Sequence, residues 1–135
     1  MKKISILLSI LIFTLFTTFV KAQHNEDATL YIEVLVDSQG RIYAQNDWVQ
    51  ESMLHAWVKN YLNSQPAFLF NDVVYRVYGD KTISSGVISD VVVNLLKGYD
   101  YQVRVEKYLL DVQELNLDGQ NYIQKLNELD WQQKE

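Results

Sequence analysis

The chain contains no cysteine, and only one proline and five glycines occur among its 135 residues. The absence of cysteine excludes disulfide frameworks, cysteine-ligated metal centres and thiol nucleophiles. The low proline and glycine contents exclude collagen-like and low-complexity chains, and the length fits one domain rather than two. Basic residues are also few, 12 Lys and Arg against 17 Asp and Glu. The resulting net charge of −5 disfavours nucleic acid as a partner, because binding a polyanion requires a clustered basic face.

The longest uncharged stretch of the chain lies near its N-terminus. Residues 4–20 carry no charge, two lysines precede them, and Val20-Lys21-Ala22 places small or apolar side chains at the −3 and −1 positions of a cleavage site. These features predict a secretory signal peptide over residues 1–22 and therefore a periplasmic protein. The alternative is an inner-membrane anchor formed by residues 4–20, with the rest of the chain in the periplasm.

Cleavage after Ala22 would leave nine basic residues against the same 17 acidic ones, a net charge of −8. Residues 23–28 are polar, and we expect a short flexible lead there.

Period-2 alternation predicts strands at 29–36, 41–44, 72–78 and 101–109. Three- and four-residue spacing predicts two helices: one runs from an Asp47 cap to about Asn63, and the other from Ser84 or Ser85 to Lys97. A short helix capped by Asp118 is expected in the polar tail, 110–135.

Two turn signals define the ends of these elements. Asp37 and Gly40 favour a hairpin with a glycine bulge between the first two strands. Gly98 is expected to end the second helix in a left-handed cap. The element order predicts an α/β (α+β) two-layer sandwich, with one mixed sheet of four to five strands and two helices on one face.

No residue pattern indicates catalysis, a metal or a cofactor. His55 is expected to be a surface or boundary residue of a helix, and Ser84-Ser85-Gly86 lacks the glycines and lysine of a nucleophile elbow or phosphate loop. Core packing is expected to explain Trp48 and Trp57, and Trp131 is the tryptophan that packing does not explain. A row of exposed aromatic side chains would instead favour a carbohydrate- or cell-wall-binding module, and paired carboxylates in one cleft would favour a small hydrolase.

The segment from Leu30 to Leu109 resembles the periplasmic domain of the ExbD/TolR biopolymer-transport family. That family shows a strand ending in Asp-x-x-Gly, a short strand, a helix, a strand ending in Asp, a Gly-Val pair that opens a helix ending in Gly, and a final strand. The residues at the matching positions are Asp37, Gly40, Asp80, Gly86 with Val87, Asp90 and Gly98. The resemblance implies an ExbD/TolR-like domain over residues 29–109.

The resemblance also implies a function. Members of that family work with a polytopic partner to energise outer-membrane transport or to hold the envelope together, and their transmembrane helix bears an essential aspartate. No acidic residue occurs here from Met1 to His24. Because a proton relay needs an ionisable group inside the bilayer, we expect a non-enzymatic accessory that binds a Ton- or Tol-type envelope protein, with peptidoglycan or a second copy as further possible partners.

The final strand carries the predicted binding residues. No strand that could pair with its outer edge follows it, so we expect an open edge that accepts an extended segment of a partner or the same strand of a second copy. Tyr101 is expected in the core with Val103 and Val105, while Arg104 and Glu106 set the register by charge. The alternative is that Leu110 to Leu117 folds back over this edge.

Overall fold

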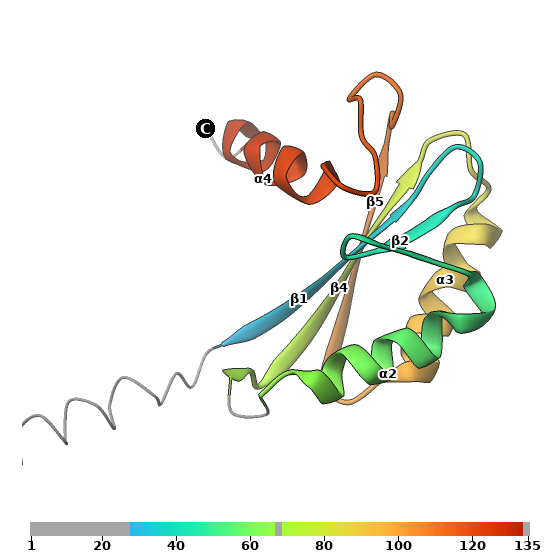
Figure 1. Cartoon of the computed structure of the whole chain (residues 1–135). Helices are drawn as coiled ribbons and strands as arrows, with labels where there is room; N and C mark the ends of the chain where they lie inside the picture. Colours follow the sequence, from blue (N-terminus) through green and yellow to red (C-terminus); the bar gives the residue numbers. More distant parts are fainter. Residues whose placement is uncertain (1–27, 67–68, 134–135) are drawn as a thin grey trace, which may run out of the picture.

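The computed structural model describes residues 28–66 and 69–133, with side chains described as far as Leu129. Within these residues one mixed sheet has the strand order β3-β2-β1-β4-β5 (Figure 1). The strands are β1 (Thr29–Val36), β2 (Ile42–Ala44), β3 (Asp47–Val49), β4 (Asp72–Asp80) and β5 (Val103–Leu110); the helices are α2 (Leu54–Ser64), α3 (Ser85–Gly98) and α4 (Tyr122–Gln133). The predicted fold class, a sheet with two helices packed on one face, is confirmed.

The central strands run in the same direction. β4 pairs in parallel with β1 on one side and with β5 on the other, whereas β2 and β3 form an antiparallel meander beside β1. Parallel neighbours need a crossover connection, which α2 and α3 provide. β4 is therefore the centre of the parallel part of the sheet, and β5 is its last strand.

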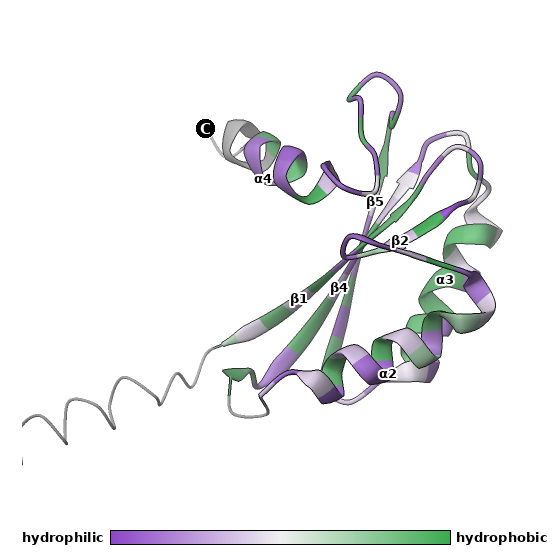
Figure 2. Ribbon diagram, viewed as in Figure 1, coloured by the Kyte–Doolittle hydropathy of each residue, from purple (hydrophilic) through white to green (hydrophobic). Residues whose placement is uncertain are grey.

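The main core lies between the sheet and the layer of α2 and α3. Alternate residues of the strands face this layer, because side chains along a strand point to opposite faces in turn. Figure 2 shows α3 as hydrophobic along much of its length, with more hydrophilic residues along α4. The fully buried members of this core are Ile32, Val34, Val36, Ala44, Leu54, Val58, Val73, Tyr75, Val77, Val91 and Leu95.

A second, smaller core lies on the opposite face of the sheet, where α4 packs. It contains Leu35 of β1, Tyr78 of β4 and Tyr122 and Leu126 of α4. The hydroxyl of the buried Tyr122 lies 2.8 Å from the carbonyl oxygen of Glu33 and 2.6 Å from that of Gln45. Burial raises the pKa of Tyr122, so this hydroxyl stays protonated and remains a donor. The predicted terminal helix is confirmed, and it covers part of the second sheet face.

The predicted start of the first helix is wrong. Asp47 lies in β3, and α2 begins only at Leu54, after a 3₁₀ turn over Glu51–Met53. The Asp47 carboxylate accepts a hydrogen bond from the indole N–H of Trp57 (2.9 Å) instead of capping a helix. Gln45, with φ of +51°, and Asn46 form a tight turn from β2 into β3, and this local turn takes precedence over the helical spacing.

Two aspartates of the family-like pattern stabilise turns at strand ends. The Asp37 carboxylate accepts hydrogen bonds from the N–H groups of Gln39 (3.0 Å) and Arg41 (2.9 Å), and Gly40 has φ of +78°. Asp80 is buried and accepts from the N–H groups of Thr82 and Val112, both at 3.0 Å. The predicted turn at Asp37 and Gly40 is confirmed, and Asp80 joins β4 to the segment that follows β5.

The role predicted for Gly98 is wrong. Gly98 is the last residue of α3, it is not among the residues with positive φ, and the cap position after it, Tyr99, is extended. A Cβ at Gly98 would lie 2.5 Å from the carbonyl oxygen of His55 and 3.0 Å from the Cβ of Val58. Gly98 therefore allows α3 to approach α2 closely. Gly86, in contrast, has nothing nearer than the Ser84 hydroxyl oxygen, at 3.9 Å.

The expected signal peptide, residues 1–22, lies outside the described residues, as does nearly all of the polar lead, 23–28. In the described part of the chain, no helix is both long and apolar enough to cross a membrane.

Candidate protein-binding edge of the sheet

β5 forms one edge of the sheet, and its backbone groups alternate in direction. The carbonyl oxygen of Gln102 accepts from Val73 (3.2 Å), and that of Leu110 accepts from Lys81 (2.7 Å). The β4–β5 register is unbroken between these two bonds. Because backbone polar groups alternate along a regular strand, those of the even-numbered residues point to β4 and those of the odd-numbered residues point away. We call the outward groups of Val103, Val105, Lys107 and Leu109 the β5 edge.

No other described segment covers the β5 edge. The chain after Leu110 crosses to the second sheet face, where Val112 and Leu117 join the small core with Tyr122. The alternative in which Leu110 to Leu117 shields the edge is therefore wrong. An edge strand with unpaired N–H and C=O groups is a template for another strand.

A groove lies beside this edge on the helix side of the sheet. It has a volume of about 320 Å³ and lies between α3 and β5. The floor is largely apolar, Leu109 is 67% exposed, and Lys107 makes no ion pair with any other described residue. The residues of this α3–β5 groove are Ile83, Ser85, Ile88, Ser89, Lys107 and Leu109.

Charged side chains cross the other face of the sheet in a row. Arg76 of β4 lies between Glu33 of β1 and Glu106 of β5, its neighbours in register, at 3.5 Å and 2.9 Å. The Arg76 guanidinium also lies 4.0 Å from the ring centroid of Tyr31. Burial alone would lower the pKa of Arg76, but its hydrogen bond to Glu106 and the charge of Glu33 raise it. Arg76 therefore keeps its charge, and its ion pair with Glu106 holds β5 in register with β4.

The three predicted binding residues do not share one environment. Arg104 and Glu106 lie on the face opposite the helices, as their spacing predicts, with Arg104 3.4 Å from Asp72. Tyr101 is not in the core: it precedes β5, is 65% exposed and lines a surface pocket with Tyr99 and Phe70. Gln102, with φ of +49°, turns the chain between Tyr101 and the strand and so removes Tyr101 from the alternation.

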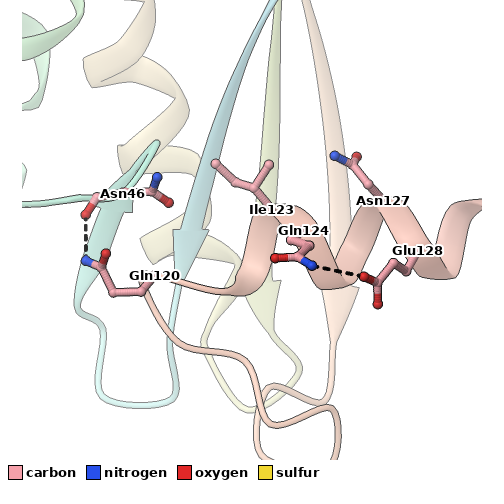
Figure 3. A pocket seen from close by; sticks show the side chains of 6 residues that line it. All are labelled: Asn46, Gln120, Ile123, Gln124, Asn127 and Glu128. Atoms are coloured by element: carbon pink, nitrogen blue, oxygen red, sulfur yellow. Dashed lines mark hydrogen bonds between the residues drawn. The ribbon is translucent and has the colours of Figure 1, made fainter.

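Sequence reasoning missed the α3–β5 groove and a second groove, next to α4. One sequence signal pointed toward the α3–β5 groove. The alternation along β5 places Lys107 and Leu109 on the same face as Val103 and Val105. The second has a volume of about 510 Å³ and is lined mainly by amide side chains, between the β2–β3 turn and α4 (Figure 3). The residues of this amide groove are Asn46, Gln120, Ile123, Gln124, Asn127 and Glu128.

The tryptophan expected in the core near this turn is exposed. Trp48 is 60% exposed and pairs across the strands with Tyr43, so it lies on the sheet face where α4 packs. Trp57 is half-buried and stacks on Tyr61 with ring centroids 5.0 Å apart, which agrees with its predicted packing role. The side chain of Trp131 lies outside the described residues.

Among the described residues no three His, Asp or Glu side chains gather as a metal site would require. His55 is exposed on α2, as expected for a surface residue.

No family model matches the chain, and no curated protein matches it.

Proposed function

We propose that this chain is a non-enzymatic protein of the cell envelope, whose ExbD/TolR-like domain binds a protein component of a Ton- or Tol-type transport system. The observation that carries the proposal is the β5 edge, which leaves outward backbone groups beside a largely apolar groove. An extended segment added to an edge strand gains main-chain hydrogen bonds, and pockets for alternate side chains supply specificity. The domain acts from the periplasm, after export by the signal peptide or on the alternative anchor at residues 4–20.

The groove indicates the kind of segment that fits. A strand paired with β5 would direct alternate side chains toward the α3–β5 groove, where Ile83, Ile88 and Leu109 favour an apolar residue. Lys107, at the same groove, favours a neighbouring acidic residue. The preferred partner sequence is therefore an extended segment that combines apolar and acidic positions on one face.

The test is a pair of substitutions at one position. Lys107→Pro removes an outward N–H without disturbing the bonds to β4, and proline is tolerated at such edge positions. Lys107→Ala keeps that N–H and removes only the side-chain charge. Pull-down from native envelope, followed by mass spectrometry, should recover a Ton- or Tol-type protein with the parent chain and with Lys107→Ala but lose it with folded Lys107→Pro. Equal recovery with both variants would contradict the proposal.

A second candidate function has its own observation. The exposed indole of Trp48 and the amide groove are next to each other along the chain, with Asn46 in the groove. Amide groups that exchange hydrogen bonds with hydroxyls, beside an aromatic ring, suit a polysaccharide such as peptidoglycan. If the chain is a cell-wall-binding module, it will sediment with insoluble peptidoglycan, and Trp48→Ala will release it while Lys107→Pro will not.

A further inference from the structure

The three parallel strands β1, β4 and β5 begin at one end of the sheet, where α2 and α3 both end (Figure 1). We call this end, with the loops 69–71 and 99–102, the entry end, because the N-terminal part of the chain joins the domain there. We propose that the entry end binds lipid, in the headgroup region of the membrane that residues 4–20 anchor. The inference takes the anchor rather than the signal peptide as the role of residues 4–20, and it concerns a surface separate from the β5 edge of the proposed function.

The entry end lies close in the chain to the anchor. The carbonyl oxygen of Ala28 accepts a hydrogen bond from the N–H of Asn71 (2.9 Å), and β1 starts at the next residue. Residues 21–28 alone separate this point from the uncharged stretch 4–20. Because a chain spans at most about 3.5 Å per residue, these residues hold the entry end within about 30 Å of the bilayer. The opposite end of β1 is roughly 25 Å farther along the strand.

Exposed apolar and aromatic side chains gather at the entry end. Tyr101 is 65% exposed and Leu69 is 54% exposed. Phe70, Tyr99 and Tyr101 line a pocket of about 380 Å³ beside Gly98. Tyrosine is enriched at the membrane–water interface, because its ring suits the apolar side and its hydroxyl suits the wet side. Binding at that interface strengthens with the apolar area that is buried among the headgroups.

The charges at the entry end favour anionic headgroups. Lys59 lines the same pocket and Lys97 lies in the last turn of α3, and neither makes an ion pair with another described residue. The acidic residues here are Asp100 and Asp72, and Asp72 is paired with Arg104 at 3.4 Å. Cations therefore outnumber acids at this end, whereas the whole chain carries a net charge of −5. Lipid phosphates attract such a cationic end of an acidic protein.

This contact also orients the domain. With the entry end on the lipid, β1, β4 and β5 run away from the bilayer, because all three begin at that end. The α3–β5 groove lies near the far end of β5, where Leu109 and Ile83 line it. The groove then faces the periplasm and stays accessible to a protein partner.

The first test measures which end of the domain touches lipid. The chain has no native cysteine, so a single introduced cysteine carries one fluorescent label. Asn63→Cys places the label beside the pocket at the end of α2, and Ser89→Cys, the matched control, places it on α3 beside the α3–β5 groove; both side chains are exposed. The full chain is reconstituted in vesicles of phosphatidylethanolamine and phosphatidylglycerol. A nitroxide on the lipid headgroup should quench the label at 63 and leave the label at 89 unquenched.

The second test separates binding by the surface from the effect of the tether. Leu69→Ser combined with Tyr101→Ser should abolish the quenching at 63. Leu109→Ser removes a comparably exposed apolar side chain at the other end of β5 and should leave the quenching unchanged. Lys59→Gln should weaken the quenching in vesicles that contain phosphatidylglycerol but not in vesicles of phosphatidylcholine alone. Circular dichroism checks that each variant folds.

The outcomes also separate this inference from the proposed function. Equal quenching at 63 and 89, or quenching at 63 that survives in the folded double variant, would overturn the lipid-binding surface. Protein recovered from native envelope with Gln23 as its first residue would overturn it too, because no anchor would then hold the entry end near the bilayer.

None of these results touches the β5 edge. Loss of an envelope protein from Lys107→Pro would still support the proposed function if the lipid contact failed. Lipid contact at the entry end, together with equal recovery of envelope protein by Lys107→Pro and Lys107→Ala, would support this inference and contradict the proposed function.

Discussion

β4 and β5 are neighbours in one sheet, run in the same direction and keep one register over eight residue pairs, yet their surroundings differ completely. Seven of the nine residues of β4 are buried and the other two are half-buried, whereas β5 has no fully buried residue. β4 has a strand on each side and β5 on one side only. Two adjacent strands therefore differ in role: β4 is buried and stabilises the fold, whereas β5 leaves one edge of the sheet open.

The largest expected contrast is between two tyrosines on these strands. Tyr75 of β4 is fully buried and donates a hydrogen bond to the carbonyl oxygen of Tyr99 (2.8 Å), whereas Tyr108 of β5 is 44% exposed and stacks on Tyr78. Tyr75→Ala should lower the free energy of unfolding by about 3–5 kcal/mol. Tyr108→Ala should lower it by about 1 kcal/mol. Urea denaturation measures both, and equal losses would remove the distinction between the strands.

A smaller effect is expected at the helix end that leads into β5. Gly98→Ala places a methyl group against the backbone of His55, so α3 must move away from α2 at an expected cost of about 1–3 kcal/mol. Gly86→Ala is the matched control in the same helix, where the space is open and alanine stabilises by up to about 1 kcal/mol. Thermal melts of the two variants should shift in opposite directions. Equal shifts would show that the α2–α3 contact at Gly98 is not tight.

Hydroxyl groups give the next contrast. Tyr122→Phe removes the donor that joins α4 to the carbonyl groups of β1 and of the β2–β3 turn, so the free energy of unfolding should fall by about 1 kcal/mol. Tyr108→Phe removes an exposed hydroxyl that lies 3.1 Å from the Glu106 carboxylate, and we expect almost no change. Chemical denaturation at one pH compares the two variants. A larger loss for Tyr108→Phe would mean that β5 depends on its outer face for stability.

The smallest expected effect is on the pH dependence of stability. The hydroxyl of Thr82, with the N–H groups of Thr82 and Val112, lowers the pKa of Asp80 although burial acts in the opposite direction. The ionised carboxylate therefore stabilises the fold fully above the unfolded pKa of about 3.9, and this stabilisation is lost as the pH falls through the lower folded pKa.

Asp80→Asn should therefore be less stable than the parent near neutral pH, and the difference should shrink below about pH 4. Asp111, after the end of β5, pairs with Lys81 on the surface at 2.6 Å, and Asp111→Asn is the control. An exposed pair contributes little, so this control should change stability less. The free energy of unfolding, measured from pH 2 to pH 7, tests this expectation. Identical pH profiles of stability for both variants would contradict the role given to Asp80.

Sequence reasoning predicted four of the five strands, the hairpin at Asp37 and Gly40, and both helices of the main layer, because alternation and helical spacing are local signals. Its predictions were wrong where contacts between distant parts of the chain determine the local structure. The first part of the helix predicted from Asp47 is instead a short strand, β3, followed by a 3₁₀ turn. Gly98 is required by the close approach of α3 to α2, which no local pattern encodes. The candidate site was predicted as an edge with Arg104 and Glu106 on one face. The α3–β5 groove depends on how α3 sits over the sheet, and the position of Tyr101 depends on one positive φ angle.

Amide hydrogen exchange along β5 tests the central claim most directly. At low protein concentration, without a partner, the amides of Arg104 and Glu106 should exchange slowly because they bond to β4, while those of Val105 and Lys107 should exchange rapidly. Adding the envelope partner should slow exchange of the amides of Val105 and Lys107 and leave the other two amides unchanged. Equal protection of all four amides in the dilute, unbound chain would contradict the account, because the edge would then already be covered.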